Sequence, residues 1–104
     1  MELVTLKLLT IIADDLLKDR ICKQVLELGA TGYTCVAAEG EGARGVRHDS
    51  FAGTNVKIQI VCPAPIADAI LTYVVQHLFE SFAVIAWLSD VSVVRGAHYA
   101  KPAT

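Results

Sequence analysis

The chain has 104 residues and a formal net charge of −2 at pH 7, with 54% hydrophobic and 19% charged residues. This length predicts one compact domain, and the acidic balance gives no basic surface of the kind that nucleic acid requires. A chain this short has little interior relative to its surface, so the excess of apolar side chains favours burial between subunits. We therefore expect a homo-oligomer that binds no nucleic acid.

The apolar segments and the cysteines indicate the compartment. No apolar run approaches the roughly 20 residues of a membrane-spanning helix, and Glu2 interrupts the basic start of a signal peptide. We therefore expect a cytoplasmic protein. Cys22, Cys35 and Cys62 are odd in number and have no C-x-x-C spacing, so we expect them to be buried and reduced.

The first half of the chain predicts a strand, a helix and a strand. Residues 3–12 are rich in aliphatic and β-branched side chains and predict the first strand. Asp14 or Asp15 can cap the helix that follows, and Gly29 ends it. Residues 33–38 predict the second strand. Apolar side chains recur at helical spacing between the cap and the glycine and define the buried stripe: Leu17, Ile21, Val25 and Leu28.

The second half repeats this layout. Residues 55–62 alternate apolar and polar side chains and predict the third strand. Pro63 and Pro65 begin a second helix, whose buried stripe is Ile66, Ile70, Val74 and Leu78. Residues 80–83 predict a turn, residues 84–94 a last strand, and residues 96–104 a loose tail.

Two strand–helix–strand units with right-handed crossovers predict an α+β fold, the ferredoxin-like βαββαβ sandwich. Its four-stranded antiparallel sheet carries both helices on one face. The other face would expose apolar side chains in a single chain, and each such side chain gains about 1.5–3 kcal/mol on burial. Association through this face therefore again favours an oligomer.

The segment from Glu39 to Gly53 departs from the regular pattern of the rest. Three glycines, Gly40, Gly42 and Gly45, alternate with charged or small residues. Arg44 and Arg47 each offer a planar fork of donors that matches phosphate or carboxylate. We expect a mobile loop between two strands that folds around an anion. The segment lacks the Lys-Ser or Lys-Thr of a Walker P-loop, so phosphate binding here does not imply kinase or NTPase machinery.

Two motifs of the sequence resemble those of a known family. The motif Gly29-Ala-Thr-Gly-Tyr-Thr34, followed by Gly40-x-Gly42-x-Arg44-x-Val46-Arg47, is similar to that of the SbtB-type PII-like signalling proteins, regulators of cyanobacterial bicarbonate uptake. The resemblance in layout covers nearly the whole chain. It implies a PII-like homotrimer, with a domain over residues 1–96, a flexible T-loop at about 40–54 and a C-terminal tail over residues 97–104.

The resemblance also implies a function. Such proteins bind the adenine nucleotides cAMP, AMP, ADP and ATP as effectors in clefts between subunits, with Mg²⁺ or Ca²⁺ as a companion of ATP. The implied partner is the sodium-dependent bicarbonate transporter SbtA, which would bring the cytoplasmic trimer to the membrane periphery. Regulation of this transporter would serve the inorganic-carbon concentrating system.

The residues of the nucleotide site follow from the same resemblance. Arg44 and Arg47 would hold phosphate. Loop backbone would come from Gly40, Gly42 and Ala43. The turn and strand start after the second helix would offer backbone to the adenine edge, through Phe82, Ala83, Val84, Ile85 and Ala86.

The sequence departs from its relatives in two places. Many members end in a cysteine-bracketed loop, whereas this chain has no cysteine after Cys62, so redox control of that kind is not expected. The basic, glycine-rich segment of nitrogen-sensing PII proteins is also missing, with Ser81-Phe-Ala-Val84 in its place. This argues against a standard response to 2-oxoglutarate.

Other function classes remain as alternatives. In the first, Glu39 or Glu41 holds a divalent cation, and the protein hydrolyses ATP or ADP slowly. In the second, the chain is a metal-tolerance module of similar trimeric shape. His48 and Asp49 are adjacent but form no cluster with cysteine, so we expect neither a metal site nor a catalytic group.

Overall fold

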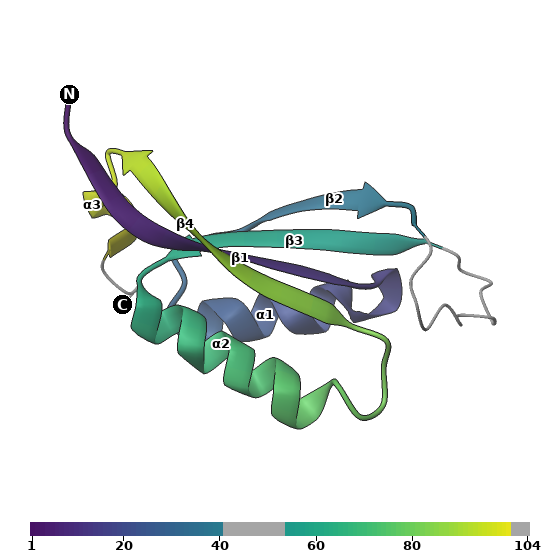
Figure 1. Cartoon of the computed structure of the whole chain (residues 1–104). Coiled ribbons are helices and arrows are strands. Elements are labelled where there is room, and N and C mark those ends of the chain that lie inside the picture. The colour runs from purple at the N-terminus through teal and green to yellow at the C-terminus, as the bar shows by residue number, and fades with distance from the viewer. Residues whose placement is uncertain (41–53, 101–104) are drawn as a thin grey trace.

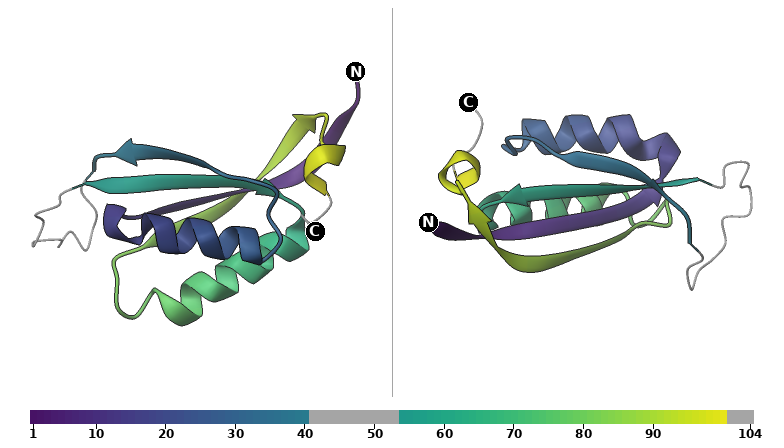
Figure 2. Two further views of the ribbon diagram at one scale, coloured as in Figure 1. Left: turned by 180° about the vertical axis from the view of Figure 1, so that it is seen from behind. Right: turned by 90° about the horizontal axis from the view of Figure 1, so that it is seen from above.

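The structure is a computed structural model that describes residues 1–40 and 54–100, and it contains one antiparallel sheet of four strands (Figure 1). The strand order is β2-β3-β1-β4. Helices α1 and α2 both cover the same face of the sheet (Figure 2). This is the predicted α+β ferredoxin-like fold. The bounds are β1 Leu3–Asp14, α1 Lys18–Glu27, β2 Thr34–Ala38, β3 Asn55–Cys62, α2 Ala64–His77 and β4 Ile85–Val94.

The predicted cap and end of the first helix are both found, but a short 3₁₀ turn separates the cap from the α-helix, which begins at Lys18. The Asp14 carboxylate accepts a hydrogen bond of 2.8 Å from the Leu16 backbone N–H and caps a 3₁₀ turn, η1 (Asp15–Leu17), that leads into α1. Gly29 has φ 115°, a conformation that favours glycine. Strand β1 runs two residues past its predicted end because its ladder with β3 continues to the pair Asp14 and Asn55.

The core lies between the sheet and the two helices. Strand β3 shows the predicted alternation, with every second side chain buried: Val56, Ile58, Ile60 and Cys62. The stripes of the two helices meet this face through fully buried side chains: Ile21, Val25, Ile70, Val74 and Leu78. Leu28 is only partly buried but packs against the same cluster. The helical periodicity therefore identified the core correctly.

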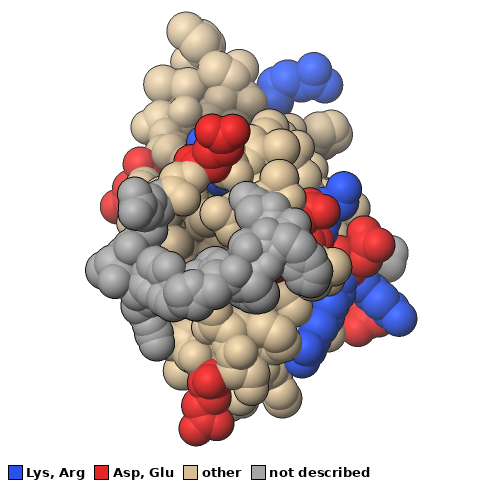
Figure 3. All heavy atoms as spheres, turned by 90° about the vertical axis from the view of Figure 1, so that its right-hand side faces the viewer, with Lys and Arg blue, Asp and Glu red and all other residues tan. Residues whose placement is uncertain are grey.

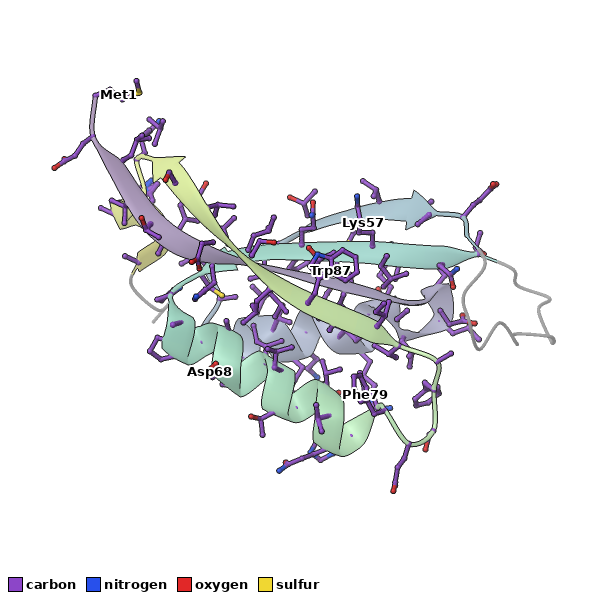
Figure 4. All side chains as sticks on the ribbon, viewed as in Figure 1. Met1, Lys57, Asp68, Phe79 and Trp87 are labelled. Carbon is purple, nitrogen blue, oxygen red and sulfur yellow. The ribbon has the colours of Figure 1, made fainter. Side chains whose placement is uncertain are left out.

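The face of the sheet away from α1 and α2 is left open by the helices. The strand register sets one row of side chains across all four strands: Thr34, Gln59, Thr10 and Trp87. A second row lies next to it: Val36, Lys57, Ile12 and Ile85. Lys57 and Trp87 mark this face in Figure 4. Apolar side chains are exposed here, since Val36, Ile85 and Trp87 are 47%, 55% and 42% exposed.

The chain after β4 differs from the prediction. Residues 96–104 were expected to form a loose tail, but Ala97–Ala100 form a short helix, α3, at the end of the sheet opposite residues 40 and 54 (Figure 1). Gly96 is buried so tightly that a Cβ there would lie 2.5 Å from the Val4 Cβ. The chain therefore lies directly against β1 just before α3, a contact that local sequence does not reveal. Residues 101–104 lie outside the described chain.

We predict that two side chains of similar size, one buried and one exposed, differ in how much unfolding free energy their replacement with alanine removes. Replacing fully buried Ile21 with alanine should cost about 2–5 kcal/mol of unfolding free energy, because it removes apolar contacts and leaves a cavity. Replacing Leu16, which is 79% exposed, should change the same quantity by less than about 0.5 kcal/mol. Urea unfolding of both variants measures the difference, and equal losses would contradict the assigned core.

We predict that the buried thiol of Cys62 makes the folded protein less stable at alkaline pH. Burial raises the pKa of the Cys62 thiol from 9.0 to about 11. The folded chain thus retains this proton above pH 9 more readily than the unfolded chain does. The resulting stabilisation is complete below pH 9 and is lost as the pH rises through 11. Thermal midpoints should therefore fall more steeply over this range in the wild type than in Cys62→Ala; parallel curves would refute the assignment.

Candidate functional site

The two ends of the glycine- and arginine-containing segment meet at one end of the sheet. Asn55, the first residue of β3, lies opposite Ala38 on β2 and opposite Asp14 on β1. The Asp15 backbone N–H donates a hydrogen bond of 3.2 Å to the Thr54 carbonyl. The chain thus leaves the sheet after residue 38 and returns at residue 54 beside the start of η1, at a fixed place in the fold.

The start of β4 lies at the same end. Ile12 on β1 is opposite both Lys57 on β3 and Ile85 on β4, so residues 82–86 and residue 54 share this end of the sheet (Figure 1). They do not share an edge. Strand β2 forms one edge and β4 the other, with β3 and β1 between them. A ligand that contacts both edges at once would therefore fit best between two copies of the chain.

The residues after α2 combine anchored and exposed groups. The Phe82 backbone N–H donates to the Leu78 carbonyl at 2.9 Å, and the Phe82 side chain is 38% exposed. Val84 and Ala86 pack against the core, whereas Ala83 and Ile85 are exposed. Strand β4 pairs on one side only within the described chain. Its outer backbone groups can therefore hydrogen-bond a ligand or another subunit.

The loop residues predicted for the site divide into two groups. Gly40 is described and exposed, and a Cβ added to it would meet no atom of the described residues within 4 Å. Its φ is not positive either, so its own backbone position does not require glycine. Gly42, Ala43, Arg44 and Arg47 lie outside the described residues.

Lys57 is a residue that the sequence analysis did not select. It is half-buried on the open face, in the row next to Trp87 and three positions beyond Thr54. The alternation of β3 placed Lys57 only on the solvent-facing side of the strand. Periodicity does not show which end of the sheet lies next to the glycine- and arginine-containing segment. As a cation at the site's end of the sheet, Lys57 can attract a phosphate or carboxylate.

The charges around this end are mixed. Figure 3 views the end of the molecule where residues 40 and 54 lie, and most of its described surface is uncharged. Basic and acidic side chains occur together along one side of that view. No three His, Cys, Asp or Glu side chains gather into a metal-binding group within residues 1–40 and 54–100. No helix in the same ranges is long and apolar enough to cross a membrane.

A family model described as nitrogen regulatory protein P-II matches residues 6–98. The chain belongs to the P-II family. Among its solved relatives is a PII-like signalling protein from Thermus thermophilus, with 42% sequence identity, coverage of 95% of this chain and 99% of that chain, and a TM-score of 0.84. The resemblance to PII-like proteins is thus confirmed at the level of the family.

CPII from Thiomonas intermedia, a nitrogen regulatory PII-like protein, also matches. Its complex with ADP, AMP and bicarbonate is 25% identical, with coverage of 96% of this chain and 98% of that chain and a TM-score of 0.82. Its complex with ADP, AMP and acetate has a TM-score of 0.85 at 24% identity, with coverage of 97% and 100%, and shows the shared fold.

The surroundings of two glycines predict opposite responses to alanine. Gly40→Ala should leave the folded state unchanged and stabilise the protein by about 0.4–1 kcal/mol, because alanine restricts the unfolded chain. Gly29→Ala should destabilise it by about 1–3 kcal/mol, because φ 115° is strained for any residue with a Cβ. Urea unfolding distinguishes the two, and a large loss at Gly40 would show that the free chain already needs glycine there.

Proposed function

We propose that this P-II family member is a homotrimeric signalling protein that binds adenine nucleotides at the end of the sheet described above. The observation that carries the proposal is the placement of residues 38–40, 54–57 and 82–86 at one end of a P-II fold. The presence of ADP and AMP in the related CPII supports adenine nucleotides as the ligand class.

The proposed site assigns each part of the nucleotide to a segment. Arg44 and Arg47 pair with the phosphates, with Gly40, Gly42 and Ala43 supplying backbone N–H groups beside them. The backbone of residues 82–86 meets the adenine edge, since the outer side of β4 is free for hydrogen bonds within the described chain. Lys57 adds a positive charge on the open face between these segments.

The open face of the sheet supports the proposed trimer. Val36, Ile85 and Trp87 are each more than two-fifths exposed there, and their burial between subunits is favourable by about 1.5–3 kcal/mol for each side chain. Packing of sheets from three copies would also bring the β2–β3 edge of one copy near the β4 edge of the next. The nucleotide would then lie between subunits, where it can contact both of them.

Nucleotide binding would act through a shift in population. A nucleotide changes the affinity for a partner only by its differential affinity for two states of the segment that carries Arg44 and Arg47, typically about 1–3 kcal/mol. AMP and cAMP offer fewer phosphate oxygens to the two guanidinium groups than ADP or ATP do. Different adenylates would therefore favour different states of the segment, which allows the protein to sense the adenylate pool.

The proposed partner is a sodium-dependent bicarbonate transporter of the SbtA type. This assignment comes from the resemblance of the Gly40–Arg47 motif to SbtB-type proteins, and the bicarbonate bound to CPII supports a link to inorganic carbon. The trimer would then act in the cytoplasm and associate with the membrane only through the transporter.

The two arginines give the sharpest test. Replacing both Arg44 and Arg47 with alanine should weaken binding of ADP at least about 100-fold in calorimetry, because each charge-assisted hydrogen bond contributes about 1.5–3 kcal/mol. The mass of the oligomer should not change, because the proposed contact between subunits uses the open face of the sheet, with Val36, Ile85 and Trp87, and neither arginine.

A matched control removes the same charge elsewhere. Lys18 and Lys23 are exposed on α1, and their double replacement with alanine lowers the net charge equally. This variant should bind ADP within a few-fold of the wild type. Unchanged affinity in the arginine variant, or an equal loss in both variants, would reject the assignment of the phosphates to Arg44 and Arg47.

A further inference from the structure

Two cysteines far apart in the chain meet between α1 and β2. The Sγ atoms of Cys22 and Cys35 lie 3.4 Å apart, in hydrogen-bonding contact, although the two residues are 13 positions apart in the chain. Both are free thiols. A disulfide bond needs an S–S distance of about 2.03–2.05 Å, so the two sulfurs would have to approach each other by roughly 1.4 Å.

The two thiols differ in exposure. Cys22 is 5% exposed and belongs to the core cluster, whereas Cys35 is partly buried on the edge strand β2. Tyr33, 44% exposed, stands two residues before Cys35 and hydrogen-bonds the Cys22 thiol. A small reagent can therefore approach Cys35 from the edge of the sheet, with Cys22 placed behind it as a second thiol.

We propose that Cys22 and Cys35 are a redox modification site, at which a low-molecular-weight disulfide reversibly oxidises the pair to an intramolecular disulfide. The pair differs from the cysteine-bracketed tail expected in SbtB-type relatives, and it does not depend on the proposed nucleotide site.

The chemistry balances as two thiol–disulfide exchanges. The Cys35 thiolate attacks one sulfur of the small disulfide, which forms a mixed disulfide and releases one small thiolate. The Cys22 thiolate then attacks the Cys35 sulfur and releases the second small thiolate. The two protons lost by the cysteines go to the two released thiolates. The protein pair is oxidised by two electrons, and the small disulfide is reduced to two thiols.

The surroundings of Cys22 affect the rate of the second thiol–disulfide exchange. Burial, together with the hydrogen bond and charge of Cys35, raises the pKa of the Cys22 thiol to about 11, while the hydrogen bond with Tyr33 and the charge of Lys18 oppose the shift. Cys22 is therefore protonated in the neutral range and attacks slowly. The proximity of the sulfurs offsets this slow step, because the reaction occurs within one chain.

Oxidation would fix the edge strand to the helix. Strand β2 has only five residues, and among residues 1–40 and 54–100 it pairs with β3 alone, so few contacts there hold it. A bond from Cys35 to α1 would close a short loop around Gly29 and restrict the unfolded chain, which stabilises the folded form. Backbone amides of residues 34–38 should then exchange with deuterium more slowly in the oxidised protein.

The test uses the wild-type protein with oxidised glutathione, followed by alkylation under denaturing conditions. The oxidised protein should retain one alkylatable thiol in place of three and should run as a monomer on a non-reducing gel. Trypsin should release peptide 21–23 linked to peptide 24–44, and dithiothreitol should separate them. The thermal midpoint should rise on oxidation.

Single variants check the order of the steps. Cys62→Ala should form the disulfide as the wild type does, because Cys62 lies on β3 and has no thiol partner within the described chain. Cys22→Ala should stop at one glutathione adduct on Cys35. Cys35→Ala should acquire no adduct in the folded state.

Three outcomes would overturn the proposal. In the first, all three thiols remain alkylatable after exposure to oxidised glutathione. In the second, the disulfide joins Cys62 to either of the other cysteines. In the third, the bond joins two chains. Each would show that the contact between Cys22 and Cys35 is ordinary packing.

Discussion

The organisation of the protein depends on the unequal coverage of its sheet. Both helices pack on one face, where the side chains of β3 alternate into a closed core. The opposite face carries Trp87 and Ile85 exposed, next to Thr10, which is 1% exposed and accepts a hydrogen bond of 3.2 Å from the Gln59 side chain. One face is thus complete within a single chain, whereas the other is suited to contact with further copies. This asymmetry underlies both the proposed trimer and the position of the proposed site.

The same sheet determines where chemistry can occur. Its order places β2 and β4 at opposite edges, while the turn before β4 and the ends of the glycine- and arginine-containing segment reach one end. A nucleotide between subunits could contact both edges, one from each copy. The Cys22–Cys35 pair lies apart from β4, between α1 and the edge strand that leads to Gly40. Redox state and adenylates would therefore act on different parts of the subunit, both of them continuous with the same segment.

Most of the fold could be predicted from the sequence because its signals are local. The alternation over residues 55–62 and the Asp14 cap each depend on neighbouring residues, and both match the structure. Helix α3 was not predicted. It follows Gly96, which lies close to Val4 although the two are far apart in the chain, and local sequence does not show such a contact. The Cys22–Cys35 contact was missed for the same reason. A spacing of 13 positions does not predict a contact, because the two cysteines meet only when α1 packs beside β2. For the site, the fold explains why residues 82–86 lie at this end of the sheet. Their contact with adenine and the phosphate contacts of Arg44 and Arg47 both rest on resemblance.

The most direct measurement is a crystal structure of the protein saturated with ADP. We predict three copies around an axis with their open sheet faces turned inward, and one ADP in each boundary between neighbours. The phosphates should contact Arg44 and Arg47, and the adenine edge should meet the backbone of residues 82–86. A monomeric assembly, or an ADP molecule bound away from both segments, would contradict the account.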